Sequence, residues 1–598
     1  MNLIVEEVTS RVIERSRPSR SAYLARLDRQ AQVGPTRGSL SCSNLAHGMA
    51  ACPQAAKDRL TEDLVPNLAI VTAYNDMLSA HQPYEGYPER IRQIAGQLGA
   101  VAQVAGGVPA MCDGVTQGQD GMELSLFSRD VIAMSTAIAL SHNMFDGALY
   151  LGICDKIVPG LMIGALSFGH LPAVFVPAGP MRSGLPNKEK AAVREAYAAG
   201  EVGKSELIAA ESASYHSAGT CTFYGTANSN QMLMEIMGLQ LPGSSFINPD
   251  DPLRDRFTER AVSQALAITC DSDDYRPIGR IVDEAAIVNA MVGLMATGGS
   301  TNHTIHLVAI AAAAGISIDW SDFSDLSRAV PLLASVYPNG QGDINQFEAA
   351  GGLAVIVAEL LSAGLLHEDV ETIVGSGLKY YAKRAVVHED KLQYSKVQPI
   401  SEDRSILRGV SDPFSPEGGI SVVEGNIGRA IVKVSALAEE HRSISAPARV
   451  FRNQDEFADA FEAGELTQDM VAVVRRQGPR ANGMPELHKL SPYLGVMQNN
   501  GLRVALLTDG RMSGASGKIL AAIQVTPEAM AGGLIDRIQD GDLITIDSAG
   551  NKLEVAADLA SRPAPQAAVD EIGMGRELFS GLRASALSAE QGASIVNL

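Results

Sequence analysis

Short apolar runs alternate with helical stretches through the first two thirds of the chain. Runs of consecutive apolar residues predict buried strands, here at residues 67–72, 101–106, 148–154 and 172–179. Residues 130–142 carry the pattern of a buried helix. Strands that alternate with helices are typical of an α/β domain with a largely parallel sheet. Ligands bind such sheets at the carboxyl ends of strands, so polar, glycine-rich segments there become candidates for chemistry.

The last third has a different pattern. Residues 470–476 and 502–508 predict strands, and residues 542–555 predict a hairpin. A charged, loop-like stretch at 381–404 precedes this region. The sequence therefore predicts a peripheral N-terminal helical arm at 1–65, an α/β catalytic domain at 66–390, and a smaller β-rich, barrel-like C-terminal domain at 391–598.

Composition and charge narrow the class of protein. Of 598 residues, 46% are hydrophobic and 19% charged, which excludes disorder as the main state. The net charge is 48 − 68 = −20, so a nucleic-acid partner is not expected. The longest stretch without a charged residue, 285–318, contains TGGSTNH and predicts two buried helices, so no membrane partner is expected. Glu6 and Glu7 interrupt the apolar start, so we expect no signal peptide and a cytoplasmic location.

The six cysteines show no CxxC spacing, which argues against zinc ribbons, thioredoxin-like chemistry and ferredoxin-type cluster runs. Cys42, Cys52 and Cys270 are interpreted as small buried hydrophobes. The other three cysteines stand beside glycines and polar residues, in CDGVTQG (112–118), CDKIVPG (154–160) and GTCTFYGTAN (219–228). A fourth polar segment, TDGRMSGASGK (508–518), is followed by Ile519 rather than Ser or Thr, so it is not a phosphate-binding loop of an NTPase.

These segments resemble the dihydroxy-acid dehydratase and phosphogluconate dehydratase family. CDKIVPGLMIG (154–164) and ALLTDGRMSGAS (505–516) are similar to its two signatures, and GGSTNHTIHL, GTCTFYGTANS and GMPELHKL also fit. The resemblance covers nearly the whole chain. Within the family it is strongest to the branch that acts on 6-phosphogluconate, on AYNDMLSAHQPY (73–84), VPAMCDGVTQGQDGMELS (108–125) and GPMRSGLPNKEK (179–190).

The resemblance implies an iron–sulfur hydro-lyase, usually a homodimer, with an α/β N-terminal domain and a smaller barrel-like C-terminal domain. The implied reaction dehydrates 6-phospho-D-gluconate to 2-dehydro-3-deoxy-6-phospho-D-gluconate in the Entner–Doudoroff pathway. The alternative substrate is an unphosphorylated sugar acid or a branched-chain dihydroxy acid. Rival classes are an electron-transfer iron–sulfur protein and a cluster-free, Mg-dependent dehydratase.

The resemblance also implies the cluster ligands, which are Cys112, Cys154 and Cys221. We expect a [4Fe–4S] cluster, with [2Fe–2S] as the alternative. The sequence departs from the dihydroxy-acid branch at one ligand, because Ala80 stands where that branch has a cysteine and Cys112 stands where it has an Asp. The third ligand is therefore expected to have moved to Cys112.

Oxygen ligands and a base complete the expected chemistry. Asp113, Asp155 and Glu486 are predicted to bind a divalent metal, for which Mg²⁺ is suited, or to frame the substrate carboxylate. The plainer alternative is that Asp155 only pairs with Lys156. The resemblance points to Ser513 as the base that removes the C2 proton, with Lys156 as a second catalytic residue. A helix N-cap is the alternative role for Ser513.

A phosphorylated substrate requires basic residues in a chain of charge −20. Arg182 is the first candidate, because its planar fork of donors suits phosphate oxygens. A surface position after a proline turn is the alternative for Arg182. The second candidates are Arg511 and Lys518. The remaining predicted substrate contacts are Ser183, Asn75 and Asp76.

Overall fold

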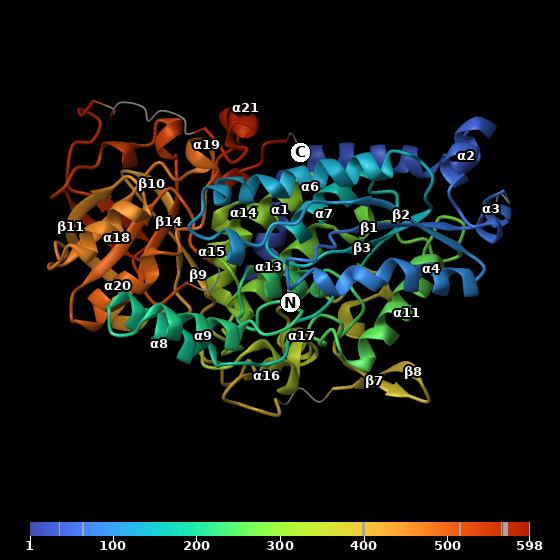
Figure 1. Ribbon diagram of the computed structural model, residues 1–598, viewed down its shortest axis with the longest axis horizontal. Helices are drawn as coiled ribbons and strands as arrows, with labels where there is room; N and C mark the ends of the chain where they lie inside the picture. Colours follow the sequence, from blue (N-terminus) through green and yellow to red (C-terminus); the bar gives the residue numbers. More distant parts are fainter. Residues whose placement is uncertain are drawn as a thin grey trace.

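The computed structural model describes residues 1–34, 36–61, 65–397, 401–513, 516–563, 565 and 572–596. The N-terminal two thirds form an α/β body, and the C-terminal third lies beside it at one end of the long axis, in orange and red in Figure 1. This arrangement confirms the predicted fold class.

The sheet of the α/β body has four parallel strands in the order β2-β1-β3-β4. They are β1 (Asn67–Thr72), β2 (Val101–Gly107), β3 (Gly147–Leu151) and β4 (Ala173–Phe175). Every residue of β1, β3 and β4 is buried, which explains their uninterrupted apolar sequences. In Figure 1, α6 (Ser125–Leu140) and α7 (Ile157–Ser167) lie on one side of the strands, with α4 (Tyr87–Gln97) and α11 (Pro252–Ala267) on the other.

Two glycines of α7 set its distance from α6. A β-carbon built on Gly160 would lie 2.4 Å from the carbonyl oxygen of Arg129, and one on Gly164 would lie 2.5 Å from Cβ of Thr136. Both approaches are too short for any side chain. The glycines of the CDKIVPGLMIG segment thus allow α7 to pack directly on α6.

The N-terminal segment differs from the expected peripheral arm. Its first helix, α1 (Leu3–Ala31), packs against α13 (Glu284–Thr297) and α15 (Trp320–Ala329). Val5, Val8 and Val12 of α1 are fully buried, because their spacing of three and four residues places them on one helix face. The charge-free stretch forms α13 and α14 (His303–Ala313), which a glycine-rich turn joins as predicted. Among the described residues, no helix is long and apolar enough to cross a membrane.

The C-terminal third forms a closed eight-stranded barrel in the order β10-β14-β13-β12-β11-β15-β16-β9. The strands are β9 (Ile420–Gly425), β10 (Gly428–Lys433), β11 (Ser443–Phe451), β12 (Met470–Val474), β13 (Val504–Thr508), β14 (Leu520–Thr526), β15 (Leu543–Asp547) and β16 (Lys552–Val555). Alternate residues fill the barrel, such as Val432 and Leu507, while Ile431 and Leu506 join the core shared with the α/β body. The predicted barrel-like region is confirmed, and its hairpin is β15–β16.

Contacts between the two parts come from several elements. Helix α8 (Asn187–Ala198) packs against α20 (Leu490–Asn499), and Thr304 Oγ1 donates to Gln524 Oε1 at 2.8 Å. The predicted domain boundary at residue 390 falls in the turn between β7 (Lys383–His388) and β8 (Lys391–Lys396), and the division itself stays a prediction.

Candidate active site between the α/β body and the barrel

The turn after β3 presents Cys154, Asp155 and Lys156 at the carboxyl end of the sheet. Cys154 has φ = 77°, in the left-handed region that non-glycine residues rarely adopt. Asn230 of α10 (Thr226–Ile236) fixes this turn, because its Nδ2 donates to the carbonyl oxygens of Cys154 at 2.8 Å and Asp155 at 3.0 Å. Strain of this kind is typical of functional sites and is held here by surrounding hydrogen bonds.

Three cysteine thiols converge beside this turn. Cys112 precedes the short helix α5 (Asp113–Thr116), and its thiol is hydrogen-bonded to that of Cys154. Cys221, from the loop before α10, lies close enough for its charge to affect the pKa of Cys154. The hydrogen bond from Cys154 lowers the pKa of Cys112 to about 7, whereas burial raises the pKa of Cys221 to about 12. One acidic thiol beside two buried ones fits a metal centre that takes three thiolates.

The other three cysteines lie elsewhere. Cys42 is exposed, and Cys52 accepts a hydrogen bond from Gln103 Nε2 at 3.1 Å. Cys270 lines a small separate cavity with Phe145 and His170. The structure thus brings together the three cysteines that the sequence singled out and keeps the remaining three apart from them.

Three buried carboxylates form a second cluster next to the thiols. Asp113 follows Cys112, Asp155 follows Cys154, and Glu486 comes from the C-terminal third. One oxygen of each lies within 4.8 Å of the others, which is compatible with a shared metal ion. The site is therefore built from both parts of the molecule.

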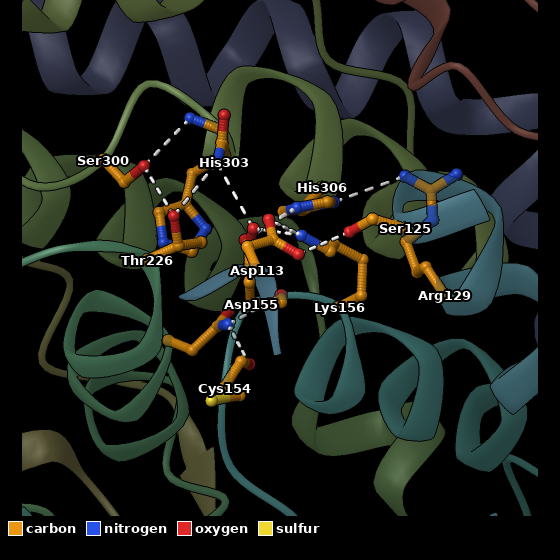
Figure 2. A network of polar contacts seen from close by, with 12 residues as sticks. Asp113, Ser125, Arg129, Cys154, Asp155, Lys156, Thr226, Ser300, His303 and His306 are labelled. Atoms are coloured by element: carbon orange, nitrogen blue, oxygen red, sulfur yellow. Dashed lines mark hydrogen bonds and ion pairs between the residues drawn. The ribbon is translucent and has the colours of Figure 1, made fainter. Parts of the chain in front are cut away.

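Two cations lie among these carboxylates. Lys156 is fully buried, and its Nζ donates to both Asp113 and Asp155. The guanidinium of Arg511 lies 2.8 Å from Glu486, 3.2 Å from Asp113 and 3.5 Å from Asp155. The expected pairing of Asp155 with Lys156 therefore exists, but it is one contact of a larger network, in which Figure 2 shows Lys156 extending toward Asp113 and Asp155.

The surrounding charges give the carboxylates different pKa values. Burial would raise the pKa of Asp155, but Lys156, His306 and Arg511 outweigh burial and hold that pKa well below its usual value. Burial and the charge of Asp113 raise the pKa of Glu486 to about 7. One carboxylate is thus firmly ionised, while another can hold a proton near neutral pH.

Residues that the sequence analysis did not assign support this network. Burial lowers the pKa of His306 to about 4, so its ring is neutral. Its Nδ1 lies 3.4 Å from Arg129, which can only donate, so its Nε2–H donates to Asp155 at 3.3 Å (Figure 2). Asn302 Nδ2 lies 3.3 Å from Glu486. Both residues belong to GGSTNHTIHL. The high density of polar residues in this otherwise apolar stretch was the signal that could have identified them.

The C-terminal segment is hydrogen-bonded to α6, the helix that carries Arg129. Arg129 of α6 donates to the carbonyl oxygen of Gly592 at 2.9 Å. Its neighbour Asp130 accepts hydrogen bonds from Ser594 Oγ at 2.9 Å and from the backbone N–H of Ile595 at 2.7 Å. Residues near the end of the described chain thus reach the site through Arg129 and His306.

The predicted substrate contacts are spread more widely. Arg182 and Ser183 are exposed, with Arg182 Nε donating to Asp250 at 2.9 Å and Asn345 Nδ2 donating to Ser183 Oγ at 3.2 Å. The surface position proposed as the alternative for Arg182 is the one observed. Arg511 is committed to the carboxylates rather than available to a phosphate.

The two residues of the AYNDML segment have local partners. Asn75 Oδ1 accepts hydrogen bonds from the backbone N–H groups of Met77 at 2.9 Å and Leu78 at 3.2 Å. Asp76 is exposed and accepts a hydrogen bond from the hydroxyl of Tyr74. Asn75 therefore caps a turn.

Ser513 and Lys518 lie on the loop that follows β13. Ser513 is half-buried, two residues from Arg511, and its carbonyl oxygen accepts from the backbone N–H of Ser516 at 2.9 Å. Lys518 is exposed, and its Nζ lies 5.7 Å from the centre of the Tyr337 ring. The same loop thus connects the carboxylate cluster with a more exposed cation.

A further cation beside the thiols was not predicted. Lys190 Nζ donates to the hydroxyl of Tyr215 at 2.8 Å and lies 5.6 Å from the centre of the Phe223 ring. Burial lowers the pKa of Lys190 to about 8, against an opposing effect of Cys221. The sequence around Lys190, NKEKAAV, is typical of a solvated helix, so it did not indicate that Lys190 is buried beside the thiols.

Comparison with known proteins agrees with this two-part site. Residues 65–381 match the dihydroxy-acid/6-phosphogluconate dehydratase N-terminal family model, and residues 405–593 match the corresponding C-terminal model. An α/β body and a β-barrel that share a site of thiols and carboxylates describe a two-domain hydro-lyase, and the chain belongs to the dihydroxy-acid/6-phosphogluconate dehydratase family.

Individual relatives cover the whole length. The chain is 58% identical to the phosphogluconate dehydratase of Pseudomonas aeruginosa over 595 residues, 98% of each protein. It is 57% identical to the phosphogluconate dehydratase of Escherichia coli K12 over 601 residues, 100% of each. A dihydroxy-acid dehydratase of Caldanaerobacter subterraneus is 35% identical over 82% of this chain and 86% of that protein. The family resemblance predicted from the motifs is confirmed.

Proposed function

We propose that the protein dehydrates 6-phospho-D-gluconate to 2-dehydro-3-deoxy-6-phospho-D-gluconate, as in the Entner–Doudoroff pathway. The observation that carries this proposal is the end-to-end identity of 57–58% with relatives named phosphogluconate dehydratase. The relative named dihydroxy-acid dehydratase is 35% identical and matches less of the chain, which favours the sugar-acid phosphate over the branched-chain alternative.

The reaction removes one water and needs no oxidant. The C2–H and C3–O bonds break, a double bond forms between C2 and C3, and the resulting enol becomes the 2-keto acid. Hydroxide is a poor leaving group, and the C2 proton is weakly acidic. The site must therefore assist departure of the C3 hydroxyl and stabilise negative charge near C2.

We infer that Cys112, Cys154 and Cys221 hold an iron–sulfur cluster, [4Fe–4S] rather than [2Fe–2S]. Their three thiols converge at a buried point and have no disulfide partner. Such a cluster supplies a Lewis acid for the C3 hydroxyl when bound. The left-handed backbone of Cys154 orients one of the thiols toward this point.

The carboxylates are assigned to a divalent cation, and Mg²⁺ suits their oxygen atoms. Asp113, Asp155 and Glu486 have the spacing for one ion. Lys156 lies among them, so its ammonium must shift from at least one carboxylate when an ion binds.

Removal of the C2 proton is assigned to Ser513 as the base, with Lys156 and Arg511 as the supporting cations. An ordinary serine hydroxyl is a weak base, and nearby positive charge favours its deprotonated form. Arg511 is two residues away and fixed by the carboxylates. Lys156 is assigned to stabilise the negative charge that develops on the substrate carboxylate, because it is held at the carboxyl end of the sheet.

The remaining assignments are a cytoplasmic location and a homodimer. Six free thiols suit a reducing compartment. The homodimer follows from the family resemblance alone, and light scattering of the purified protein tests it.

The proposed function has a direct test. Protein purified without oxygen is analysed for iron and sulfide, then assayed with 6-phosphogluconate, gluconate and a branched-chain dihydroxy acid. We expect bound iron and sulfide and the highest kcat/KM with 6-phosphogluconate, without any electron acceptor. Turnover of the dihydroxy acid at the higher kcat/KM would contradict the substrate. Full activity in protein free of iron would contradict the cofactor.

A further inference from the structure

Lys433 is the last residue of β10 and faces out of the barrel. Ile431 and Lys433 are two residues apart on one strand and therefore share a face. Ile431 belongs to the core that continues into the α/β body, whereas Val432 belongs to the barrel interior. The Lys433 side chain thus extends toward the side of the barrel that meets the α/β body.

The ammonium of Lys433 is buried and has no counter-charge among the described residues. The residue is 8% exposed, and the described residues offer its Nζ no hydrogen-bond partner. Burial lowers the pKa of Lys433 to about 7. Buried lysines are ordinarily paired, as Lys156 is, so an unpaired one at an internal boundary needs an explanation.

The loop that carries Ser513 ends directly over Lys433. A β-carbon built on Gly517 would lie 3.3 Å from Cδ and 3.7 Å from Cε of Lys433. The loop begins near the carboxylates with Arg511 and ends with Lys518, whose ammonium faces Tyr337. Two lysines, one buried and one exposed, therefore flank the C-terminal end of the loop.

We propose that Lys433 binds the phosphate of the substrate. This inference rests on the proposed function, since it concerns the far end of the same substrate. A phosphate carries nearly two negative charges and supplies the counter-charge that Lys433 lacks in the free protein. The flexible four-carbon stem of lysine lets the ammonium reach an anion beside Gly517.

The position favours phosphate over the substrate carboxylate. In 6-phosphogluconate the carboxylate is bonded to C2, where the proton is lost, and the phosphate is at the opposite end of the six-carbon chain. The reacting end belongs at the thiols and carboxylates, where Lys156 and Arg511 are already placed. Lys433 lies at the other end of the loop and has no role in that network.

The two arginine candidates are already paired with carboxylates. Arg182 is exposed and paired with Asp250, and Arg511 is paired with Glu486, Asp113 and Asp155. Neither offers a free guanidinium to a phosphate. Lys433 differs from both because its charge is unsatisfied and its surroundings exclude water, where a new ion pair gains most.

The experiment compares Lys433→Met, Lys433→Arg and the wild-type holoenzyme, with Lys552→Met as the control. Lys552 is a lysine of the same barrel that pairs with Glu554 at the surface, at 3.0 Å. Three quantities are measured in each protein: KM for 6-phosphogluconate, inhibition by inorganic phosphate, and inhibition by gluconate. Iron content and the thermal midpoint report whether each variant is loaded and folded.

We expect Lys433→Met to raise KM for 6-phosphogluconate and to weaken inhibition by inorganic phosphate by roughly tenfold or more. Inhibition by gluconate should change less than about twofold. Lys433→Arg should retain most of the phosphate affinity, and Lys552→Met should match the wild type. Equal weakening of phosphate and gluconate, or no change in either, would overturn the inference.

Two further measurements separate this inference from the proposed function. If Lys433→Met does not fold, calorimetric titration of the wild type and Lys433→Arg with inorganic phosphate decides. Phosphate that fails to bind the wild type contradicts the role of Lys433. If the iron-loaded wild type binds phosphate but does not turn over 6-phosphogluconate, the proposed function fails while the anion site stands.

Discussion

The thiol cluster and the carboxylate cluster are neighbours, yet they differ in how their charges are satisfied. Asp113, Asp155 and Glu486 surround two fixed cations, and the pKa of Asp155 lies well below its usual value. The hydrogen bond with the thiol of Cys112 and burial instead raise the pKa of Cys154 well above its usual value. The carboxylates are balanced by cations in direct contact with them, whereas the charge of Lys190 beside the thiols does not outweigh burial at Cys221.

This difference predicts how each cluster depends on a metal. Thiols of raised pKa are protonated at neutral pH, and a metal must displace their protons to bind. The thiol cluster should therefore be completed only by its cofactor. The carboxylate cluster has internal ion pairs and should be ordered before any ion arrives.

The largest expected effect is at the thiols. Cys154→Ser should abolish the brown iron–sulfur absorbance and the activity, because a serine oxygen replaces a ligand at the centre of the group. Iron and sulfide analysis together with the visible spectrum measures this. Cys270→Ser, which changes a cysteine outside the cluster, should leave both unchanged. A Cys154→Ser protein with full iron would break the comparison, since the thiols would then not be the ligands.

The second effect is at Ser513, which belongs to neither cluster. Ser513→Ala should lower kcat by orders of magnitude, because a positioned base contributes roughly 10²–10⁴ to the rate. Iron content should stay at the wild-type value, since no thiol or carboxylate is altered. Near-normal kcat with 6-phosphogluconate would assign the C2 proton to another residue.

The third effect tests the internal balance of the carboxylates. Lys156→Met leaves Asp113 and Asp155 with one fewer cation, so the free energy of unfolding should fall by about 3–5 kcal/mol. Urea denaturation measures this change. Lys518→Met, which removes an exposed lysine, should change the free energy of unfolding by less than about 0.5 kcal/mol. Equal effects of the two substitutions would show that the carboxylates are not balanced by Lys156.

The smallest effect concerns Asp509, a buried carboxylate held by backbone amide donors. It accepts hydrogen bonds from the backbone N–H groups of Gln477 at 2.8 Å and Ala529 at 2.9 Å, and burial raises its pKa to about 6. A raised pKa means that the folded state binds the proton more tightly than the unfolded state. The stability from this group is thus present below about pH 4 and is lost as pH rises toward 6.

Asp509→Asn should therefore reduce the loss of stability between pH 4 and pH 6 by up to about 3 kcal/mol. Calorimetric melting across this pH range measures the slope. Glu440→Gln, an exposed substitution in the same third of the chain, is the control and should keep the wild-type slope. An unchanged slope for Asp509→Asn would mean that cations are not what separates Asp155 from other buried carboxylates.

The apolar runs allowed the sheet and several barrel strands to be predicted, because fully buried strands have uninterrupted apolar sequences. Strands β9, β10, β11 and β14 were not predicted, and β9 and β10 carry Glu, Arg and Lys, which weaken the apolar pattern. The burial of α1 was missed although Val5, Val8 and Val12 have helical spacing. The surrounding arginines and glutamates outweighed that signal.

The site residues that are adjacent in the sequence could be predicted, and those brought together only by the fold could not. Cys154, Asp155 and Lys156 were predictable together because they are adjacent and follow a buried strand. The approach of Arg511 and Glu486 to them depends on how two domains meet, which no local pattern specifies. Lys433 ends an apolar run, where a lysine ordinarily signals solvent, so only the structure reveals that it is buried.

The hydrogen bonds from α6 to Gly592, Ser594 and Ile595 have a consequence for the order of assembly during synthesis. Arg129 and Asp130 pair with each other at 2.7 Å, but they gain these C-terminal partners only after residues 592–595 have left the ribosome. Until then two buried charges of the N-terminal body lack contacts that they have in the finished protein. We therefore expect a chain that lacks residues 592–596 to be made but to bind metal poorly at the site.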